Sequence, residues 1–267
     1  MKLADVYAVI DGAYPKKLSD VYVKNSGAHD NSGVLIDTGD DITGMVFSLD
    51  LSGGAIAAAK ARGANLIVTH HPAIFFPVSA LNVQDASGAR LVSCLRAGIC
   101  VISMHLNLDF APEGIDYQLA KGIGGQDVSD TYENIDGGAY GRVYDVRRQS
   151  FADLCAHVSK EFHTERLLSY GAEGEISRAA SFCGAGVDGG AIRFAKERGA
   201  DVIVSSDVKH NYICDILESG MRLVVLTHYA SENYGFKKIY QKIGDKLGVP
   251  AYYHEDGFML RFQGGIK

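Results

Sequence analysis

Residues 53–71 read GGAIAAAKARGANLIVTHH, and residues 189–207 read GGAIRFAKERGADVIVSSD, so the chain contains an internal repeat. The segments align without a gap and share 11 of 19 residues, in the order Gly, Gly, Ala, Ile, Ala, Lys, Arg, Gly, Ala, Ile and Val. In each copy an alanine-rich helical segment ends at an Arg-Gly pair, and a short β-prone run follows. The repeat therefore predicts two related α/β halves.

A second pair of matching segments follows the first. Residues 97–105 (AGICVISMH) and 219–228 (SGMRLVVLTH) each contain a glycine that ends a helix, a buried strand and a histidine. The predicted unit is strand–helix–strand–helix–strand, which favours largely parallel sheets covered by helices. We expect the halves at 1–130 and 131–267. Between the two repeats, we predict a helix over Phe151–His163 and a strand over Leu167–Tyr170.

The composition is that of an ordinary globular protein. The chain has 267 residues, of which 47% are hydrophobic and 22% charged, and its formal net charge is −6. No run of Lys and Arg exceeds a pair, so broad binding to nucleic acid, which needs a concentrated basic face, is disfavoured. A small phosphorylated ligand remains compatible, because a local metal charge could attract it.

The chain start and the cysteines point to the cytoplasm. The first residues lack a basic segment followed by an apolar one, so no secretory signal is expected. No stretch approaches the roughly 18 apolar residues of a membrane span. The cysteines are odd in number and without a CxxC pair, which predicts reduced thiols and makes them poor metal-site candidates: Cys94, Cys100, Cys155, Cys183 and Cys214.

Polar loops follow the predicted buried strands, and ligands gather at the carboxyl ends of strands in α/β sheets. The loops read HHP at 70–72, HLNLD at 105–109, SDVKH at 206–210 and HYASE at 228–232. Adjacent side chains on a strand point to opposite faces. Pro72 would end the strand, so a turned backbone could let His70 and His71 address two nearby points. The alternative is two solvent-exposed loop histidines.

Two loops pair a histidine with a carboxylate four residues later. A helix that starts near Ser231 would put Glu232 in its first turn, within reach of a ligand atom on His228. Alternatively, Glu232 complements the helix N-terminus and His228 is a satisfied core residue. In the other loop Asp109 is a candidate ligand, whereas His105 could orient a ligand.

The second copy has Asp207 and His210 in the loop that corresponds to the paired histidines. This loop has diverged, so we assign it a supporting or substrate-facing role beside a purely structural alternative. Asn107, between His105 and Asp109, is also assigned a supporting role.

Together the loops supply three imidazoles and two carboxylates. Nitrogen and oxygen donors without thiolate suit Zn, Fe, Mn, Ni or Co. Five side chains exceed the needs of one tetrahedral ion, so we predict two divalent ions, whose residual positive charge would favour an anionic substrate. The predicted ligands are His70, His71, Asp109, His228 and Glu232.

At these residues the chain resembles the dinuclear metal centre protein family, often described as GTP cyclohydrolase I type 2-like. The resemblance covers nearly the whole chain, although His29 stands where the family usually has Trp and Leu106 where Thr is common. It rests on the Asp30–Gly33 motif DNSG, THHPAIF, HLNLD, GAYGRVYD, FCGAGVDGG, SDVKH and HYASE.

The resemblance implies that the same five residues bind metal. It also implies two similar α/β domains that face each other across a metal-containing cleft. It further implies a ring-shaped homohexamer whose sites face an internal cavity.

The leading functional hypothesis is a metal-dependent hydrolase that acts on a nucleotide or other phosphorylated small molecule, GTP cyclohydrolase-like activity being one candidate. His105 or His210 could carry a proton. The first alternative is a non-catalytic module for metal handling or regulatory protein interaction. The second is a protein whose metals only stabilise the fold.

Overall fold

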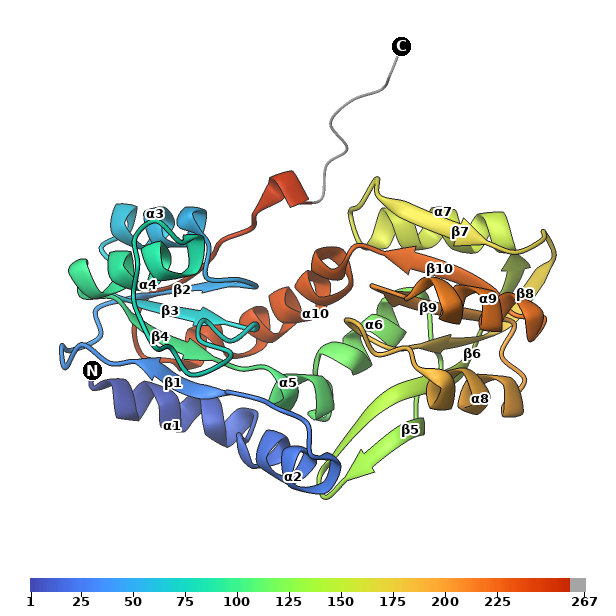
Figure 1. Cartoon of the computed structure of the whole chain (residues 1–267), viewed down its shortest axis with the longest axis horizontal. Helices are drawn as coiled ribbons and strands as arrows, with labels where there is room; N and C mark the ends of the chain where they lie inside the picture. Colours follow the sequence, from blue (N-terminus) through green and yellow to red (C-terminus); the bar gives the residue numbers. More distant parts are fainter. Residues whose placement is uncertain (260–267) are drawn as a thin grey trace, which may run out of the picture. The chain divides into compact units, whose positions relative to one another are not determined.

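Figure 1 shows the computed structural model, which describes residues 1–259. The chain forms two compact units. Unit 1 comprises Met1–Ala111 and Phe236–Asp256, and unit 2 comprises Pro112–Gly235 and the segment that begins at Gly257. The halves expected from the repeat, 1–130 and 131–267, follow the duplication in the sequence. They do not coincide with these units, because the chain returns to unit 1 at Phe236.

Unit 1 is built around a five-stranded sheet in the order β1-β4-β3-β2-β11. Strands β2, β3, β4 and β11 run parallel, and β1 pairs antiparallel with β4. Its elements are α1 (Leu3–Ala13), α2 (Lys17–Ser26), β1 (Gly33–Ile36), β2 (Met45–Ser48), α3 (Gly53–Ala61), β3 (Leu66–Thr69), α4 (Ala86–Arg96), β4 (Cys100–Ser103), α5 (Leu106–Phe110), the short 3-10 helix η1 (Gly244–Lys246) and β11 (Ala251–Tyr253).

Unit 2 is built around a six-stranded sheet in the order β5-β6-β8-β9-β10-β7. Strands β8, β9 and β10 run parallel, and β5, β6 and β7 pair antiparallel with their neighbours. Its elements are α6 (Ile115–Ile123), β5 (Asp130–Ile135), β6 (Gly138–Ser150), α7 (Phe151–Glu161), β7 (Leu167–Tyr170), β8 (Glu175–Ser181), α8 (Gly189–Glu197), β9 (Val202–Ser206), α9 (His210–Glu218), β10 (Arg222–Leu226) and the 3-10 helix η2 (Gly257–Met259). The long helix α10 (His228–Ile243) begins in unit 2 and continues into unit 1.

The duplication is visible in the topology of the two sheets. The order β2-α3-β3-α4-β4 in unit 1 matches β8-α8-β9-α9-β10 in unit 2, and the three strands are parallel in each. The match extends further, because β1 lies antiparallel to β4 as β7 lies antiparallel to β10. The predicted α/β fold, the helix from Phe151 and the strand Leu167–Tyr170 are confirmed, and the sheets are mixed rather than wholly parallel.

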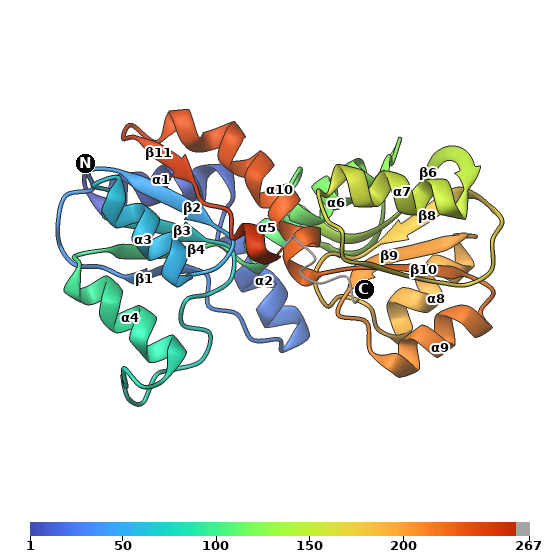
Figure 2. The same cartoon turned by 90° about the horizontal axis from the view of Figure 1, so that it is seen from above.

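Parallel strands at the centre of each sheet are buried on both faces. In unit 1 the side chains of Val46, Ile67 and Val101 lie on the face of the sheet that α3 and α4 cover. In unit 2, α8 and α9 cover the face that carries Ile203 and Leu223, and α6 and α7 pack on the other face (Figure 2). Burial on both faces explains why these strands read as continuous apolar runs. Across residues 1–259, no helix combines the length and apolar character needed to cross a membrane.

Candidate metal centre

The neighbouring parallel strands β3 and β4 end side by side in unit 1, with Thr69 opposite Ser103. His70 directly follows the first strand and His105 lies two residues beyond the second. Asp109 lies on the five-residue helix α5, where the sequence predicted a loop. The shared carboxyl edge of the sheet therefore brings together side chains 35 to 39 residues apart in the chain.

These side chains form the first donor set, which we define as His70, His71, His105 and Asp109. Ligand atoms of His70, His105 and Asp109 all lie within 4.8 Å of one another. The ring of His70 is 4.9 Å from that of His71 and 5.2 Å from that of His105, measured between centroids. The predicted turn after Thr69 thus holds both histidines at one place.

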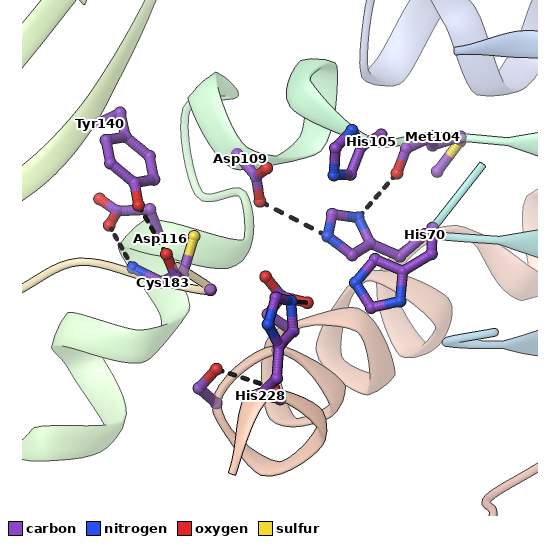
Figure 3. Close-up of polar contacts among 12 residues, drawn as sticks. His70, Met104, His105, Asp109, Asp116, Tyr140, Cys183 and His228 are labelled. Atoms are coloured by element: carbon purple, nitrogen blue, oxygen red, sulfur yellow. Dashed lines mark hydrogen bonds and ion pairs between the residues drawn. The ribbon is translucent and has the colours of Figure 1, made fainter. Parts of the chain in front are cut away.

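The tautomer of His70 follows from its surroundings. Its ring is fully buried, and Nδ1 lies 2.8 Å from the carbonyl oxygen of Met104. A carbonyl only accepts hydrogen bonds, so Nδ1 carries the proton and the lone pair of a neutral ring is on Nε2. Nε2 faces Oδ1 of Asp109 (Figure 3), and these two atoms lie 3.7 Å apart. This is the arrangement of an imidazole that binds a metal through Nε2.

The other two histidines of the set are held by carboxylates. Nδ1 of His71 donates to Oδ1 of Asp50 over 2.7 Å, and Nδ1 of His105 donates to Oδ1 of Asp30 over 2.7 Å. Metal-binding histidines commonly donate their second ring nitrogen to a carboxylate, which fixes the ring and makes the other nitrogen more basic. His71 therefore presents Nε2 as its metal-donor atom, and His105 presents Nε2 as the atom that would carry an exchangeable proton.

The second donor set, His228 and Glu232, lies in unit 2. Helix α10 begins at His228, three residues before the predicted start, because Thr227 caps it by accepting the N–H of Ala230. The two side chains are therefore one helical turn apart on one face. Nε2 of His228 lies 3.0 Å from Oε2 of Glu232, and Nδ1 donates to Asp207 over 2.7 Å.

Asn107 and His210 have other contacts. Asn107 is buried, and its amide donates to the carbonyl of Tyr14, which ties α5 to the end of α1. His210 is the exposed first residue of α9, with Nε2 3.8 Å from Sγ of Cys214. Among residues 1–259 it joins no cluster of potential metal ligands. His105, by contrast, lies in the first donor set.

Sequence reasoning missed the roles of Asp50 and Asp30. Asp50 follows strand β2 by two residues, so the rule that picked the other loops could have found it. Asp30 is 75 residues from His105, and no local pattern links them. Its signal was the Asp30–Gly33 motif, in which Ser32 donates to the same carboxylate.

The carboxylate of Asp30 is stabilised in its ionised form. Burial opposes ionisation, but hydrogen bonds from His105, Ser19 and Ser32 outweigh it and lower the pKa of Asp30 to about 2. Burial likewise works against protonation of His105, yet the bond to Asp30 and the charge of Asp109 raise the pKa of this histidine. Asp30 therefore holds a positive or proton-donating His105 ring in place.

Asp30 makes a pH-dependent contribution to stability. Its pKa falls from 3.8 to about 2 on folding, and its side chain is 2% exposed, so we expect about 2 kcal/mol of stabilisation. A lowered pKa stabilises the fold above the unfolded value, so the contribution is complete above about pH 4 and disappears as the pH falls through about 2. Urea unfolding of metal-free Asp30→Asn should show a large deficit at pH 7 and a small one near pH 2. An equal deficit at both pH values would contradict the assignment, and Asp5→Asn, on an exposed helix face, is the control.

Two aromatic side chains line the loop after His71. Phe75 approaches the ring of His105 edge-on at 6.0 Å, and Phe76 stacks on His29 at 4.8 Å. His29 also bonds the carbonyl of Phe75 through Nε2, over 2.7 Å. Phe76 is 64% exposed, so this loop presents an apolar surface near the first donor set.

Known proteins resemble this chain over most of its length. A Clostridium perfringens protein named GTP cyclohydrolase 1 type 2 homolog is 27% identical over 252 residues, 92% of this chain and 93% of the relative. A Methanocaldococcus jannaschii protein of the same name is 25% identical over 254 residues, 93% of this chain and 97% of the relative. These relatives agree with the resemblance drawn from the motifs.

Solved structures share the fold. A hypothetical protein of Staphylococcus aureus superposes with a TM-score of 0.85 at 24% identity and covers 99% of both chains. A Bacillus cereus protein related to NIF3 gives 0.81 at 17% identity, over 94% of this chain and 96% of that one. The family model described as Duf34/NIF3 (NGG1p interacting factor 3) matches residues 1–254. The chain therefore belongs to the Duf34/NIF3 family.

Proposed function

We propose that the protein binds two divalent metal ions through His70, His71, Asp109, His228 and Glu232. We further propose that it is a metal-dependent hydrolase of a nucleotide or other phosphorylated small molecule. GTP cyclohydrolase-like chemistry is one member of this class, in line with the names of the relatives.

One observation carries the proposal: the three histidines of the proposed ligand set are each held at Nδ1 by an oxygen acceptor. The pairs are His70 with Met104, His71 with Asp50 and His228 with Asp207. A core histidine needs only one hydrogen-bonded ring nitrogen, whereas three rings fixed so that Nε2 is the donor atom suit a metal centre. The same outer contact occurs in both units, which favours a shared purpose for the two donor sets.

The donor atoms fit the ions predicted from the sequence. Imidazole nitrogen and carboxylate oxygen suit Zn, Fe, Mn, Ni or Co. Two such ions supply Lewis-acid polarisation of the substrate and activation of a water molecule.

The protein's own residues would hold the metal-binding rings in place and supply a proton to the substrate. His105 is held by Asp30 and is 22% exposed at its side chain, so it can exchange a proton with substrate or solvent. Its raised pKa favours a proton donor near neutral pH. Asp50 and Asp207 keep the rings of His71 and His228 from turning away.

The carboxylates that hold the histidine rings also affect how strongly an anionic substrate is attracted. Two ions bring +4, the ligands Asp109 and Glu232 bring −2, and the carboxylates of Asp30, Asp50 and Asp207 bring a further −3. The sum is −1, so no net positive charge remains to attract an anion from a distance. We therefore expect a phosphorylated substrate to be selected by direct contact at short range rather than by long-range attraction.

Turnover by metal-loaded protein tests the proposal. Protein loaded with Zn, Mn or Fe should hydrolyse at least one compound of a nucleotide and phosphoester panel, and the double variant His70→Ala, Glu232→Ala should lose that activity. The matched control is His157→Ala, Glu197→Ala, which removes the same residue types outside the donor sets and should keep it. Equal turnover by the first double variant would refute the hydrolase. Tight metal binding without turnover would favour metal handling instead.

A further inference from the structure

Cys183 lies in a tightly fixed turn after strand β8. The residue is 3% exposed. Its N–H donates to Oδ1 of Asp116 over 3.4 Å and its carbonyl accepts the hydroxyl of Tyr140 over 2.5 Å (Figure 3). The next carbonyl, of Gly184, accepts the hydroxyl of Ser206 over 2.7 Å. The backbone that carries the thiol is therefore held on both sides.

This turn lies directly against the second donor set. Gly184 has φ +57°, and a Cβ there would come within 2.5 Å of Oε1 of Glu232 and 3.4 Å of Cε1 of His228. Only glycine leaves both donors in place and adopts this backbone without strain. The close approach brings Sγ of Cys183 within 4.8 Å of a carboxylate oxygen of Glu232.

The spacing suits two ligands of one ion. With bonds of about 2.3 Å to sulfur and 2.1 Å to oxygen, a tetrahedral ion places these two ligand atoms about 3.6 Å apart. A shift of about 1 Å in two side chains would bring both onto a common ion. Thiolate is a soft donor that favours Zn and Fe over Mg or Mn.

The other cysteines differ from Cys183. Among residues 1–259, Cys183 is the cysteine that joins a cluster of potential metal ligands. Burial raises the pKa of Cys94 to about 11, and burial also raises the pKa of Cys155. Those two therefore remain neutral thiols near pH 7. No sequence pattern singles out Cys183, because it has no partner at CxxC spacing.

We propose that Cys183 is a further ligand to the ion held by His228 and Glu232. Its thiol releases a proton to solvent as it binds, and the resulting thiolate makes this position selective for Zn(II), Co(II) or Fe(II). The inference rests on the metal-binding part of the proposed function and extends it to metal choice.

Cobalt spectroscopy of the full chain tests the proposal independently of turnover. Bound Co(II) should give visible ligand-field bands together with a near-ultraviolet sulfur-to-cobalt charge-transfer band. Cys183→Ser should lose the charge-transfer band and bind cobalt about tenfold or more weakly, since loss of even an outer contact weakens metal sites by about 10–100-fold. Manganese affinity should change much less. Cys94→Ser, which replaces another buried cysteine, should keep the band.

The other outcomes separate the two proposals. Visible bands without a charge-transfer band in the unmodified protein would overturn the role of Cys183 and leave the metal centre standing. A charge-transfer band that persists in Cys183→Ser would also overturn it. Absence of cobalt binding in equilibrium dialysis would overturn both. Because the first result is read on the unmodified chain, poor folding of a variant cannot obscure it.

Discussion

Metal affinity is expected to fall by more than about 100-fold when His70 is replaced by alanine, since loss of even an outer contact to a ligand costs about 10–100-fold. His70 is fully buried at the end of β3, and the carbonyl of Met104 fixes its tautomer. Alanine removes the Nε2 donor atom, which lies 3.7 Å from Oδ1 of Asp109. Isothermal titration of zinc into chelator-treated protein measures the loss.

A graded pair of variants strengthens this experiment. Asp50→Asn keeps every proposed ligand and weakens the bond that orients His71, so we expect a smaller loss of about 10–100-fold. Asp5→Asn removes a carboxylate from an exposed helix face and should leave affinity unchanged. Unchanged zinc affinity in His70→Ala, with a native circular dichroism spectrum, would remove His70 from the ligand set.

Unit 2 is expected to lose about 3–5 kcal/mol of unfolding free energy in Asp116→Ala, because the change leaves a buried arginine without its counter-charge. Asp116 is fully buried and Arg142 is 5% exposed. Nε of Arg142 donates to Oδ2 of Asp116 over 2.9 Å, and the same carboxylate accepts the N–H groups of Gly141 and Cys183. One side chain thus ties α6 to β6 and to the turn after β8.

Urea denaturation followed by circular dichroism measures this effect. The double variant Asp116→Leu, Arg142→Met removes both charges and should recover most of the loss, because an apolar pair of similar volume often replaces a buried ion pair without cost. The exposed pair Arg148–Glu175 is the control, and Arg148→Ala should change stability little. A small effect in Asp116→Ala would show that solvent reaches Arg142 in the folded protein.

The sequence alone predicted the elements and the places where polar groups gather. The repeat identified α3 with β3 and α8 with β9, because helical and strand patterns of side chains are local properties of a segment. The rule that ligands follow the carboxyl ends of parallel strands then picked the loops of His70, Asp109 and His228. The same rule reached Asp207, which holds the ring of His228.

The tertiary structure alone decided which partners meet. His105 pairs with Asp30 across 75 residues and His71 with Asp50 across 21, and no periodicity in the sequence records such pairs. The five-residue helix α5, which carries Asp109, is tied to Tyr14 by the amide of Asn107. Helix α10 starts early because Thr227 caps it. Neither contact follows from a pattern in the sequence. Cys183 has no motif partner, so only the fold of unit 2 brings it near Glu232. A side chain's chemistry depends on its neighbours in space, and packing of distant segments chooses those neighbours.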